Sequence, residues 1–225
     1  LGELKSRFVT MASHEFKTPL ATILTSTTLI GKYQKSEDQI HREKHLKRIS
    51  DTVLNLSNLL NEFLSIGKLE EGKIKPKPEL FFLPDHMKEI VSEMQSQAGE
   101  GKQILIEMPE VGDVELDKEL IRYVMLNLLS NAIKFSPPAS TITVKAFRKN
   151  DVLNIEVQDQ GIGISRKDQE HLFERFFRGR NADNIQGTGL GLHIVQRYLK
   201  LMEGEIKIQS ELNKGTIISL LFENK

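Results

Sequence analysis

Cysteine is absent from the 225-residue sequence, which excludes disulfide bonds and thiolate metal sites. Net charge is absent too: 31 Lys and Arg residues balance 31 Asp and Glu residues, so no overall field attracts nucleic acid or a membrane surface. No apolar run approaches the roughly 20 residues that span a bilayer, and no signal peptide is visible. We therefore expect no nucleic-acid partner and no direct membrane contact by this segment.

The composition is that of an ordinary soluble protein, with 39% hydrophobic and 28% charged residues. Its length suits one large domain or two modest ones. The sequence begins at Leu1 rather than methionine, already in a helical pattern. We therefore expect a segment of a longer protein, with any membrane anchor upstream of Leu1. The absence of cysteine fits a location in the reducing cytoplasm.

Residues 1–72 have the periodicity of two amphipathic helices joined by a turn. Apolar residues recur three or four positions apart from Leu4 to Ile30 and again from Leu46 to Phe63, with a polar turn at residues 31–38. This pattern predicts an antiparallel helical hairpin. One hairpin cannot bury so wide an apolar stripe, so we expect a second copy to complete a four-helix bundle as a homodimer. Packing of the hairpin against the C-terminal domain is the alternative.

The first helix contains the stretch SHEFKTPL, residues 13–20. His14 and Glu15 place a nucleophile beside a carboxylate that can orient it or take its proton. Thr18 lies four residues after His14 and so shares its helix face. Pro19 cannot donate to the carbonyl of Glu15, so we expect a bend here, with either a functional or a packing role.

Three short patterns in this half resemble known motifs or metal sites, but each has a plainer interpretation. The stretch from His14 to Thr18 begins like a zinc-protease HExxH motif, but Thr18 replaces the second histidine. His41 and His45 could clamp a metal ion, yet charged neighbours favour a solvated helix face. Residues 67–73 nearly form a phosphate-binding P-loop, but Ile74 replaces the magnesium-binding hydroxyl residue.

The pattern changes at Gly72, where lysines alternate with prolines through Glu79. This composition predicts an extended connector. We accordingly divide the chain into a helical hairpin at residues 1–72, a linker at 73–79 and a second domain at 80–225.

The second domain mixes helical and strand patterns. Helices are predicted near 84–98, 117–135 and 192–201, and strands at 80–83, 104–108, 114–116, 141–148, 152–158, 205–211 and 216–222. Strands that pair mostly with their neighbours, with helices grouped between them, predict an α+β sandwich in which a mixed sheet is covered on one face.

Four clusters in this domain have the chemistry of a nucleotide site, although each has a plainer interpretation as a turn, an exposed face or core. On one helix face, Asn127 and Asn131 offer amide oxygens to Mg²⁺ and Lys134 offers a cation to phosphate. Asp159 directly follows a predicted strand and can accept a hydrogen bond from an amino group. Residues 187–192, with three glycines, open a helix whose N-terminus can cradle phosphates. Residues 172–178 resemble an aromatic anchor before a polar lid at 179–186.

Taken together and in this order, these residues resemble the catalytic core of a bacterial-type sensor histidine kinase over essentially the whole chain. Residues 14–20 resemble the H box and residues 127–137 (NLLSNAIKFSP) the N box. The G1, F and G2 boxes of the family are matched by residues 159–164, 172–178 and 187–192. One departure is Asn213, where relatives often have glycine; asparagine tolerates a positive φ, so we expect the turn to survive.

The resemblance implies that Mg·ATP bound by a domain of the gyrase and histidine-kinase ATPase superfamily phosphorylates His14. The phosphoryl group would then pass to an aspartate of a response-regulator receiver domain. It implies Asn131 as the main Mg²⁺ ligand, supported by Asn127, and Thr18 as the residue that places water for a reverse, phosphatase reaction. The implied nucleotide contacts are Asn127, Asn131, Lys134, Phe135, Asp159, Gly161, Gly163, Ile164, Phe176, Phe177, Arg178, Gly187, Thr188, Gly189, Leu190, Gly191, Leu192 and Thr216.

Two other functions fit parts of the sequence. One is an inactive kinase that binds nucleotide as a dimeric scaffold. The other is an ATPase of the same superfamily that hydrolyses ATP to drive clamp closure. Such enzymes typically place a glutamate where Asn127 stands, and Asn127 cannot act as a general base for water.

Overall fold

The computed structural model describes residues 2–99, 101–179 and 187–223, without the side chains of residues 2–11 and 14. It divides into two compact units, Leu1–Gly67 and Lys68–Lys225. The second unit therefore includes the last turn of the second long helix.

The first unit holds the predicted helical hairpin except for the last turn of its second helix. Helix α1 (Gly2–Lys32) continues through Pro19, and helix α2 spans Gln39–Glu70 after the short 3₁₀ helix η1 (Ser36–Asp38). The rings of Phe16 and Phe63 lie 5.8 Å apart and mark where the two helices meet. At the turn, the Arg42 guanidinium donates to the carbonyl oxygens of Tyr33 (2.6 Å) and Lys35 (3.0 Å).

Much of the apolar stripe on this hairpin stays exposed. The exposed large side chains of the first unit include Leu20, Leu24, Leu46, Leu54, Leu60 and Leu64. Buried leucines contribute about 1.5–3 kcal/mol each. The hairpin thus leaves a large part of its hydrophobic stabilisation unused, as the stripe predicts.

In the second unit, the linker leads into a two-stranded antiparallel sheet of β1 (Glu79–Phe82) and β3 (Asp113–Leu116). The buried carboxylate of Asp117 ties three segments together. Its Oδ1 accepts from the Leu120 amide (2.9 Å) and caps the following helix, while Oδ2 accepts from the Lys77 amide (2.7 Å). This N-cap was predicted, whereas the small separate sheet was not.

The main sheet has five strands in the order β2-β4-β5-β7-β6. They are β2 (Gln103–Glu107), β4 (Thr141–Lys149), β5 (Val152–Asp159), β6 (Glu205–Glu211) and β7 (Gly215–Glu223). Strand β2 runs parallel to β4 and every other pairing is antiparallel, so the sheet is mixed as expected. Positive φ at Asn150 (51°) and Asp151 (62°) closes the tight β4–β5 hairpin.

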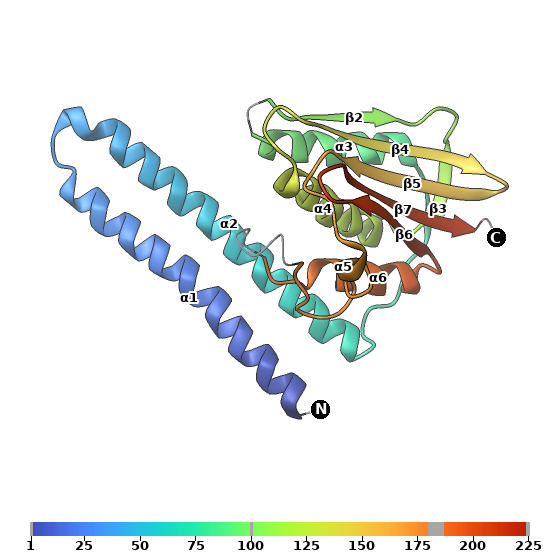
Figure 1. Cartoon of the computed structure of the whole chain (residues 1–225), viewed down its shortest axis with the longest axis horizontal. Coiled ribbons are helices and arrows are strands. Elements are labelled where there is room, and N and C mark those ends of the chain that lie inside the picture. Colours follow the sequence, from blue (N-terminus) through green and yellow to red (C-terminus); the bar gives the residue numbers. More distant parts are fainter. Residues whose placement is uncertain (1, 100, 180–186, 224–225) are drawn as a thin grey trace. The chain divides into compact units, whose positions relative to one another are not determined.

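Three helices cover one face of this sheet: α3 (Leu83–Gln97), α4 (Lys118–Phe135) and α6 (Gly191–Leu201) (Figure 1). A four-residue helix, α5 (Arg166–Gln169), follows β5. The core lies between the helices and the sheet and includes Met87, Ile121, Leu129, Ile155, Ile194 and Leu220, all of them fully buried. The prediction of an α+β sandwich with one covered face is confirmed.

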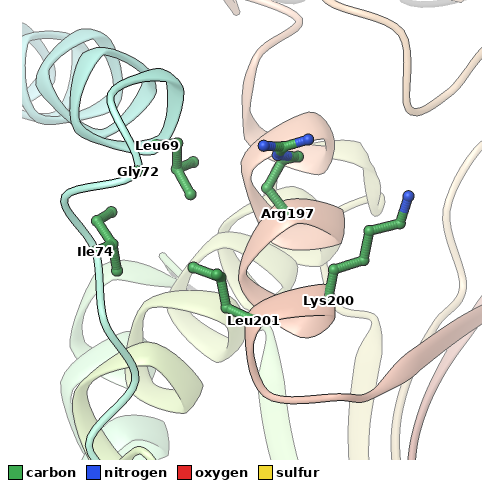
Figure 2. A pocket seen from close by; sticks show the side chains of 6 residues that line it. All are labelled: Leu69, Gly72, Ile74, Arg197, Lys200 and Leu201. Carbon is green, nitrogen blue, oxygen red and sulfur yellow. The ribbon is translucent and has the colours of Figure 1, made fainter.

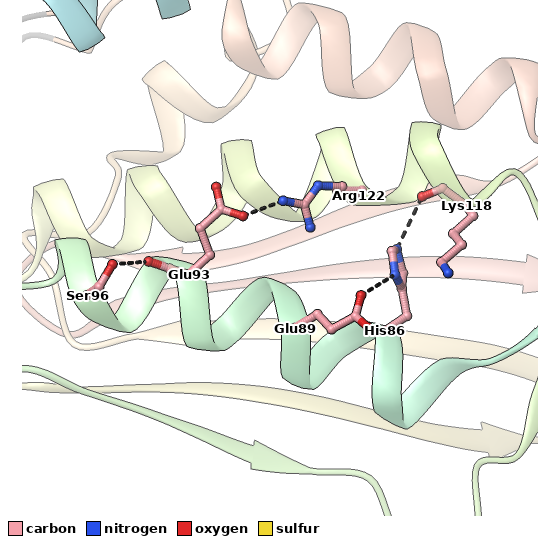
Figure 3. Close-up of polar contacts among 6 residues, drawn as sticks. All are labelled: His86, Glu89, Glu93, Ser96, Lys118 and Arg122. Carbon is pink, nitrogen blue, oxygen red and sulfur yellow. Dashed lines mark hydrogen bonds and ion pairs between the residues drawn. The ribbon is translucent and has the colours of Figure 1, made fainter.

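Polar contacts join α3 to α4 beside this core (Figure 3). The buried His86 ring lies 3.2 Å from the Lys118 carbonyl oxygen, which can only accept, so Nε2 is the donor. Arg122 on α4 forms an ion pair with Glu93 on α3. Burial, together with the nearby charge of Lys118, lowers the pKa of His86 and keeps the ring neutral.

No helix among the described residues is long and apolar enough to cross a membrane.

Candidate functional site

The predicted phosphoacceptor stretch lies on α1. His14 belongs to this helix by its backbone, but its side chain is outside the described residues. Glu15 is half-buried and Thr18 is exposed. Pro19 is buried inside the helix, and the Thr22 hydroxyl donates to the Thr18 carbonyl oxygen (3.1 Å). The helix therefore passes through the proline without a break, while a bend there remains a prediction.

Asp159 ends the central strand β5 and faces the start of β7. Its Oδ1 accepts hydrogen bonds from the amides of Gly161 (2.7 Å) and Thr216 (3.2 Å). Among the described residues, none donates to the other oxygen, Oδ2. Burial raises the pKa of this carboxyl, although the two amide donors oppose the shift. The site thus holds a carboxylate with one fixed oxygen and one oxygen available to a donor.

Two glycines allow the turn after Asp159 to pass close to other backbone. A side chain at Gly161 would place its Cβ 2.7 Å from the Phe135 carbonyl oxygen. Gly163 has φ +66°, and a Cβ there would overlap the carbonyl of Glu211 at the end of β6. Asn213 adopts φ 61° in the neighbouring β6–β7 turn, so the expectation that asparagine would preserve this turn is confirmed.

The side chains of Ser210 and Gln169 hold this turn by hydrogen bonds, and the sequence analysis predicted neither residue. The Ser210 hydroxyl accepts from the Ile164 amide (2.9 Å) and lies 2.8 Å from the Thr216 hydroxyl. The Gln169 amide donates to the carbonyl oxygens of Ile164 and Ser210, both at 2.9 Å. The one signal in the sequence for Ser210 was a polar residue at an inward-facing position of β6.

The amide pair on α4 has a defined orientation. The Asn131 Nδ2 group donates to Asn127 Oδ1 (3.2 Å), so the Asn131 carbonyl oxygen points away from its neighbour. Lys134 lies one turn further, with its amine 5.2 Å from the centre of the Phe135 ring. Within the described part of the chain, no group of three or more His, Cys, Asp or Glu side chains could hold a metal ion.

The glycine-rich segment at 187–192 lies directly against this helix face. A Cβ on Gly187 would be 2.7 Å from the Lys134 amine, and one on Gly191 would be 2.5 Å from Asn127 Nδ2. The segment leads into α6, which begins at Gly191, and within it the Leu190 amide donates to the Thr188 hydroxyl (3.1 Å). Leu190 is fully buried and Leu192 is half-buried. The glycine segment that leads into α6 therefore lies beside the Lys134 amine and the Asn127 amide side chain.

The aromatic segment at 172–178 contacts the same glycine loop. Phe176 has φ 65°, and its amide donates to the Gly189 carbonyl oxygen (3.0 Å). Gly189 has φ +69°, and a Cβ there would be 2.6 Å from the Phe177 carbonyl oxygen. Arg178 is half-buried. Of the predicted lid at 179–186, residues 180–186 lie outside the described residues.

A histidine outside every predicted motif also joins these segments. His193 Nδ1 lies 2.9 Å from the Phe173 carbonyl oxygen, and the Arg175 Nε–H donates to His193 Nε2 (3.2 Å). Arg175 also pairs with Glu70. Burial and the charge of Arg175 lower the pKa of His193. The hydrogen bond to the Phe173 carbonyl raises it but does not outweigh them. Its position directly after the glycine segment was the one signal in the sequence.

A separate cavity of about 180 Å³ lies between α6 and the segment where α2 ends and the linker begins (Figure 2). Its lining is apolar and basic: Leu69, Gly72, Ile74, Arg197, Lys200 and Leu201. None of these residues is a predicted nucleotide contact, so this cavity is distinct from the glycine-lined site.

Comparison with family models gives two matches. Residues 4–72 match the His Kinase A (phospho-acceptor) domain, and residues 116–225 match the histidine kinase-, DNA gyrase B- and HSP90-like ATPase domain. Together the two models cover the helical hairpin and most of the second unit.

Curated relatives are similar over nearly the whole chain. The non-motile and phage-resistance protein of Caulobacter vibrioides is 31% identical over 97% of this chain and 27% of its own length. The aerobic respiration control sensor protein ArcB of Escherichia coli is 30% identical over 96% of the chain and 28% of its own length. The chain spans between about a quarter and a half of the first such relatives.

Solved structures share the fold. The Acinetobacter baumannii histidine kinase AdeS superposes with a TM-score of 0.71 at 20% identity, covering 93% of this chain and 97% of that one. The histidine kinase ThkA in complex with the response regulator protein TrrA gives a TM-score of 0.71 at 21% identity, covering 100% and 62% of the two chains.

Proposed function

The chain belongs to the sensor histidine kinases of two-component systems, and from that premise we propose that it transfers the γ-phosphoryl group of ATP to His14. The observation that carries this proposal is the contact of the three glycines in the 187–192 segment with the other clusters. Gly187 faces Lys134, Gly189 faces the aromatic segment and Gly191 faces Asn127. These contacts support the proposal, because they bring together residues that are far apart in sequence and whose chemistry suits a phosphate site.

Asp159 is proposed to select adenine. Its available oxygen, Oδ2, would accept a hydrogen bond from the exocyclic amino group of the base. The Gly161 and Thr216 amides hold Oδ1 and thus fix the direction of the carboxylate. Gly161 and Gly163 carry no side chains where the adjoining turn passes close to other backbone, and Thr216 and Ile164 are the proposed contacts next to this turn.

The phosphates are proposed to lie at the N-terminus of α6. The amides of residues 187–192 and the positive end of the helix dipole favour an anion there, and the Lys134 amine adds a full charge. Asn131 directs its carbonyl oxygen away from Asn127, as a ligand for Mg²⁺ would. The bound ion would neutralise charge on the phosphates, consistent with a site that offers few protein ligands.

At His14, one nitrogen of the neutral imidazole would form the new N–P bond as the bond from the γ-phosphorus to the departing ADP oxygen breaks. Glu15 would accept a hydrogen bond from the other ring N–H and take up the positive charge that develops. Positioning and charge neutralisation dominate phosphoryl transfer. Lys134, Asn131 and the glycine loop therefore carry the larger share of the rate enhancement.

The phosphoryl group would next pass to an aspartate of a response-regulator receiver domain, and Thr18 would place water for the reverse reaction. The solved complex of ThkA with its response regulator has the same fold and supports this partner class. A homodimer would bury the exposed leucines of the hairpin. The whole protein would act in the cytoplasm, either free or anchored through other segments.

The test is incubation of the full chain with γ-labelled ATP and Mg²⁺, alongside His14→Gln. We expect label on the unaltered chain alone, lost in acid and stable in alkali, as a phosphohistidine requires. Tight nucleotide binding without label would instead identify an inactive scaffold. Steady phosphate release that His14→Gln does not change would identify a clamp-type ATPase.

A further inference from the structure

His193 lies in the first turn of α6, between the glycine loop and the aromatic segment. It belongs to none of the motifs that define the proposed function. The inference below deepens that function and rests on it, because it concerns how the phosphate loop is held.

One ring nitrogen of His193 must donate a hydrogen bond and the other must accept one, because the partner of each can play only one role. The Phe173 carbonyl oxygen can only accept, so His193 Nδ1 carries the proton and donates across 2.9 Å. The Arg175 guanidinium can only donate, so His193 Nε2 is unprotonated and accepts across 3.2 Å. Only the neutral Nδ1–H tautomer satisfies both bonds.

These bonds fix the backbone that holds Gly189. Phe173 and Arg175 precede Phe176, whose amide donates to the Gly189 carbonyl oxygen at 3.0 Å. Phe176 and Gly189 both have positive φ, and the Gly189 Cα approaches the backbone of Phe176 and Phe177 too closely for a Cβ to fit. A shift at residues 173–175 would therefore move the centre of the glycine loop.

We propose that neutral His193 is a positioning residue for Mg·ATP binding. Its imidazole holds residues 173–176 against α6, so that Gly189 keeps the conformation in which the loop amides converge on phosphate. The ring does not touch the nucleotide and takes part in no bond that forms or breaks.

Protonation of His193 would undo this arrangement. A proton on Nε2 removes the acceptor for Arg175 and sets two cations face to face. Three charged groups act on the ring: Arg175 from the aromatic segment, Arg197 one turn further along α6, and Glu70 from the last turn of α2. Burial and the two arginines oppose the charged form, whereas the hydrogen bond to Phe173 and the charge of Glu70 favour it. Because the pKa is lowered from 6.5, the ring is neutral at neutral pH and charges only in acid.

The experiment measures the affinity of the full chain for a non-hydrolysable Mg·ATP analogue by titration calorimetry, from about pH 7.5 to about pH 5.5. His193→Asn keeps a donor for Phe173, His193→Gln keeps an acceptor for Arg175, and neither side chain titrates. His193→Leu removes both bonds. His171→Asn is the matched control, since His171 is a more exposed histidine of the same region and pairs with Glu174 at 2.7 Å. Far-UV circular dichroism checks folding at each pH.

We expect His193→Leu to bind about three- to tenfold more weakly at neutral pH, as the loss of one or two hydrogen bonds implies. His193→Asn and His193→Gln should retain more affinity than His193→Leu and weaken less in acid than the unaltered chain, whereas His171→Asn should keep the full acid response. Because the variants and the unaltered chain are compared at the same pH, protonation of the nucleotide affects all of their affinities equally.

Equal affinity of His193→Leu and the unaltered chain would overturn the positioning role while leaving the proposed function intact. An acid response in the Asn and Gln variants equal to that of the unaltered chain would also overturn it. Failure of the unaltered chain to bind the analogue at any pH would overturn the proposed function and this inference together.

Discussion

Replacement of Gly163 by alanine separates two physical costs, because the chain provides a matched position. Gly163 (φ +66°) and Gly72 (φ +61°) share the left-handed conformation, but only Gly163 is crowded. A Cβ on Gly72 meets nothing within 4 Å, whereas a Cβ on Gly163 would overlap the Glu211 carbonyl. Gly72→Ala therefore reports backbone strain alone, about 1 kcal/mol.

Gly163→Ala adds a forced shift of the β6–β7 turn, for which overpacking typically costs about 1–3 kcal/mol. The shift also weakens the hydrogen bonds from the Asn213 amide to the Ile162 carbonyl oxygen (2.8 Å) and from the Ile164 amide to Ser210 (2.9 Å). Each contributes about 1 kcal/mol. We expect a total loss of about 3–5 kcal/mol for the second unit.

The assay is thermal unfolding of both variants, followed by circular dichroism, together with titration of Mg·ATP. Each kcal/mol lowers the melting temperature of a domain this size by about 2–4 °C. Gly163→Ala should therefore melt roughly 4–16 °C below Gly72→Ala. It should also lose nucleotide affinity that Gly72→Ala keeps. Melting temperatures within about 2 °C of each other would refute the proposed collision.

Three further predictions concern the site. Asp159→Asn should raise the free energy of unfolding of the nucleotide-free chain at neutral pH. Burial raises the carboxyl pKa of Asp159 above 3.8, so the folded chain is most stable when this carboxyl is protonated. That stability is lost as pH rises through the raised pKa. Denaturation of both chains from about pH 4 to about pH 7 should show the gap widening with pH, and a gap independent of pH would contradict this reasoning. Asn131→Ala should slow autophosphorylation by about a hundredfold, while Ser130→Ala, an exposed neighbour on α4, should not; equal rates would remove Asn131 from the metal site. Glu15→Ala should slow labelling of the chain by roughly a hundredfold without changing ATP affinity, and an unchanged rate would remove the role assigned to Glu15.

The helices and strands could be predicted because the spacing of apolar residues within each element is a local property of the sequence. The helix at 117–135 with its Asp117 cap and the two C-terminal hairpins match the structure to within a residue or two. The structure also brings together the predicted residues Asp159, Gly161, Gly163 and Thr216. Their roles in binding nucleotide stay predictions, as does the role of His14.

Contacts that depend on register across the sheet could not be predicted. The support of Thr216 by Ser210 depends on how β6 and β7 pair, and the link of His193 to Phe173 spans 20 positions through an irregular segment. Neither residue type has a local signature there. The separate β1–β3 sheet escaped prediction for the same reason, since its strands lie on either side of α3.

The pairing of Asp159 with Thr216 has a consequence for synthesis. The two residues are 57 positions apart, and Gly163 needs the end of β6 beside it. A growing chain therefore carries the helix of the proposed phosphoacceptor and most of the sheet before the proposed adenine site can form. At translation rates of about 5–20 residues per second, this interval lasts roughly 3–11 s. During that time the nascent protein cannot bind ATP through Asp159, so the order of the strands postpones the proposed kinase activity until the last hairpin has been made.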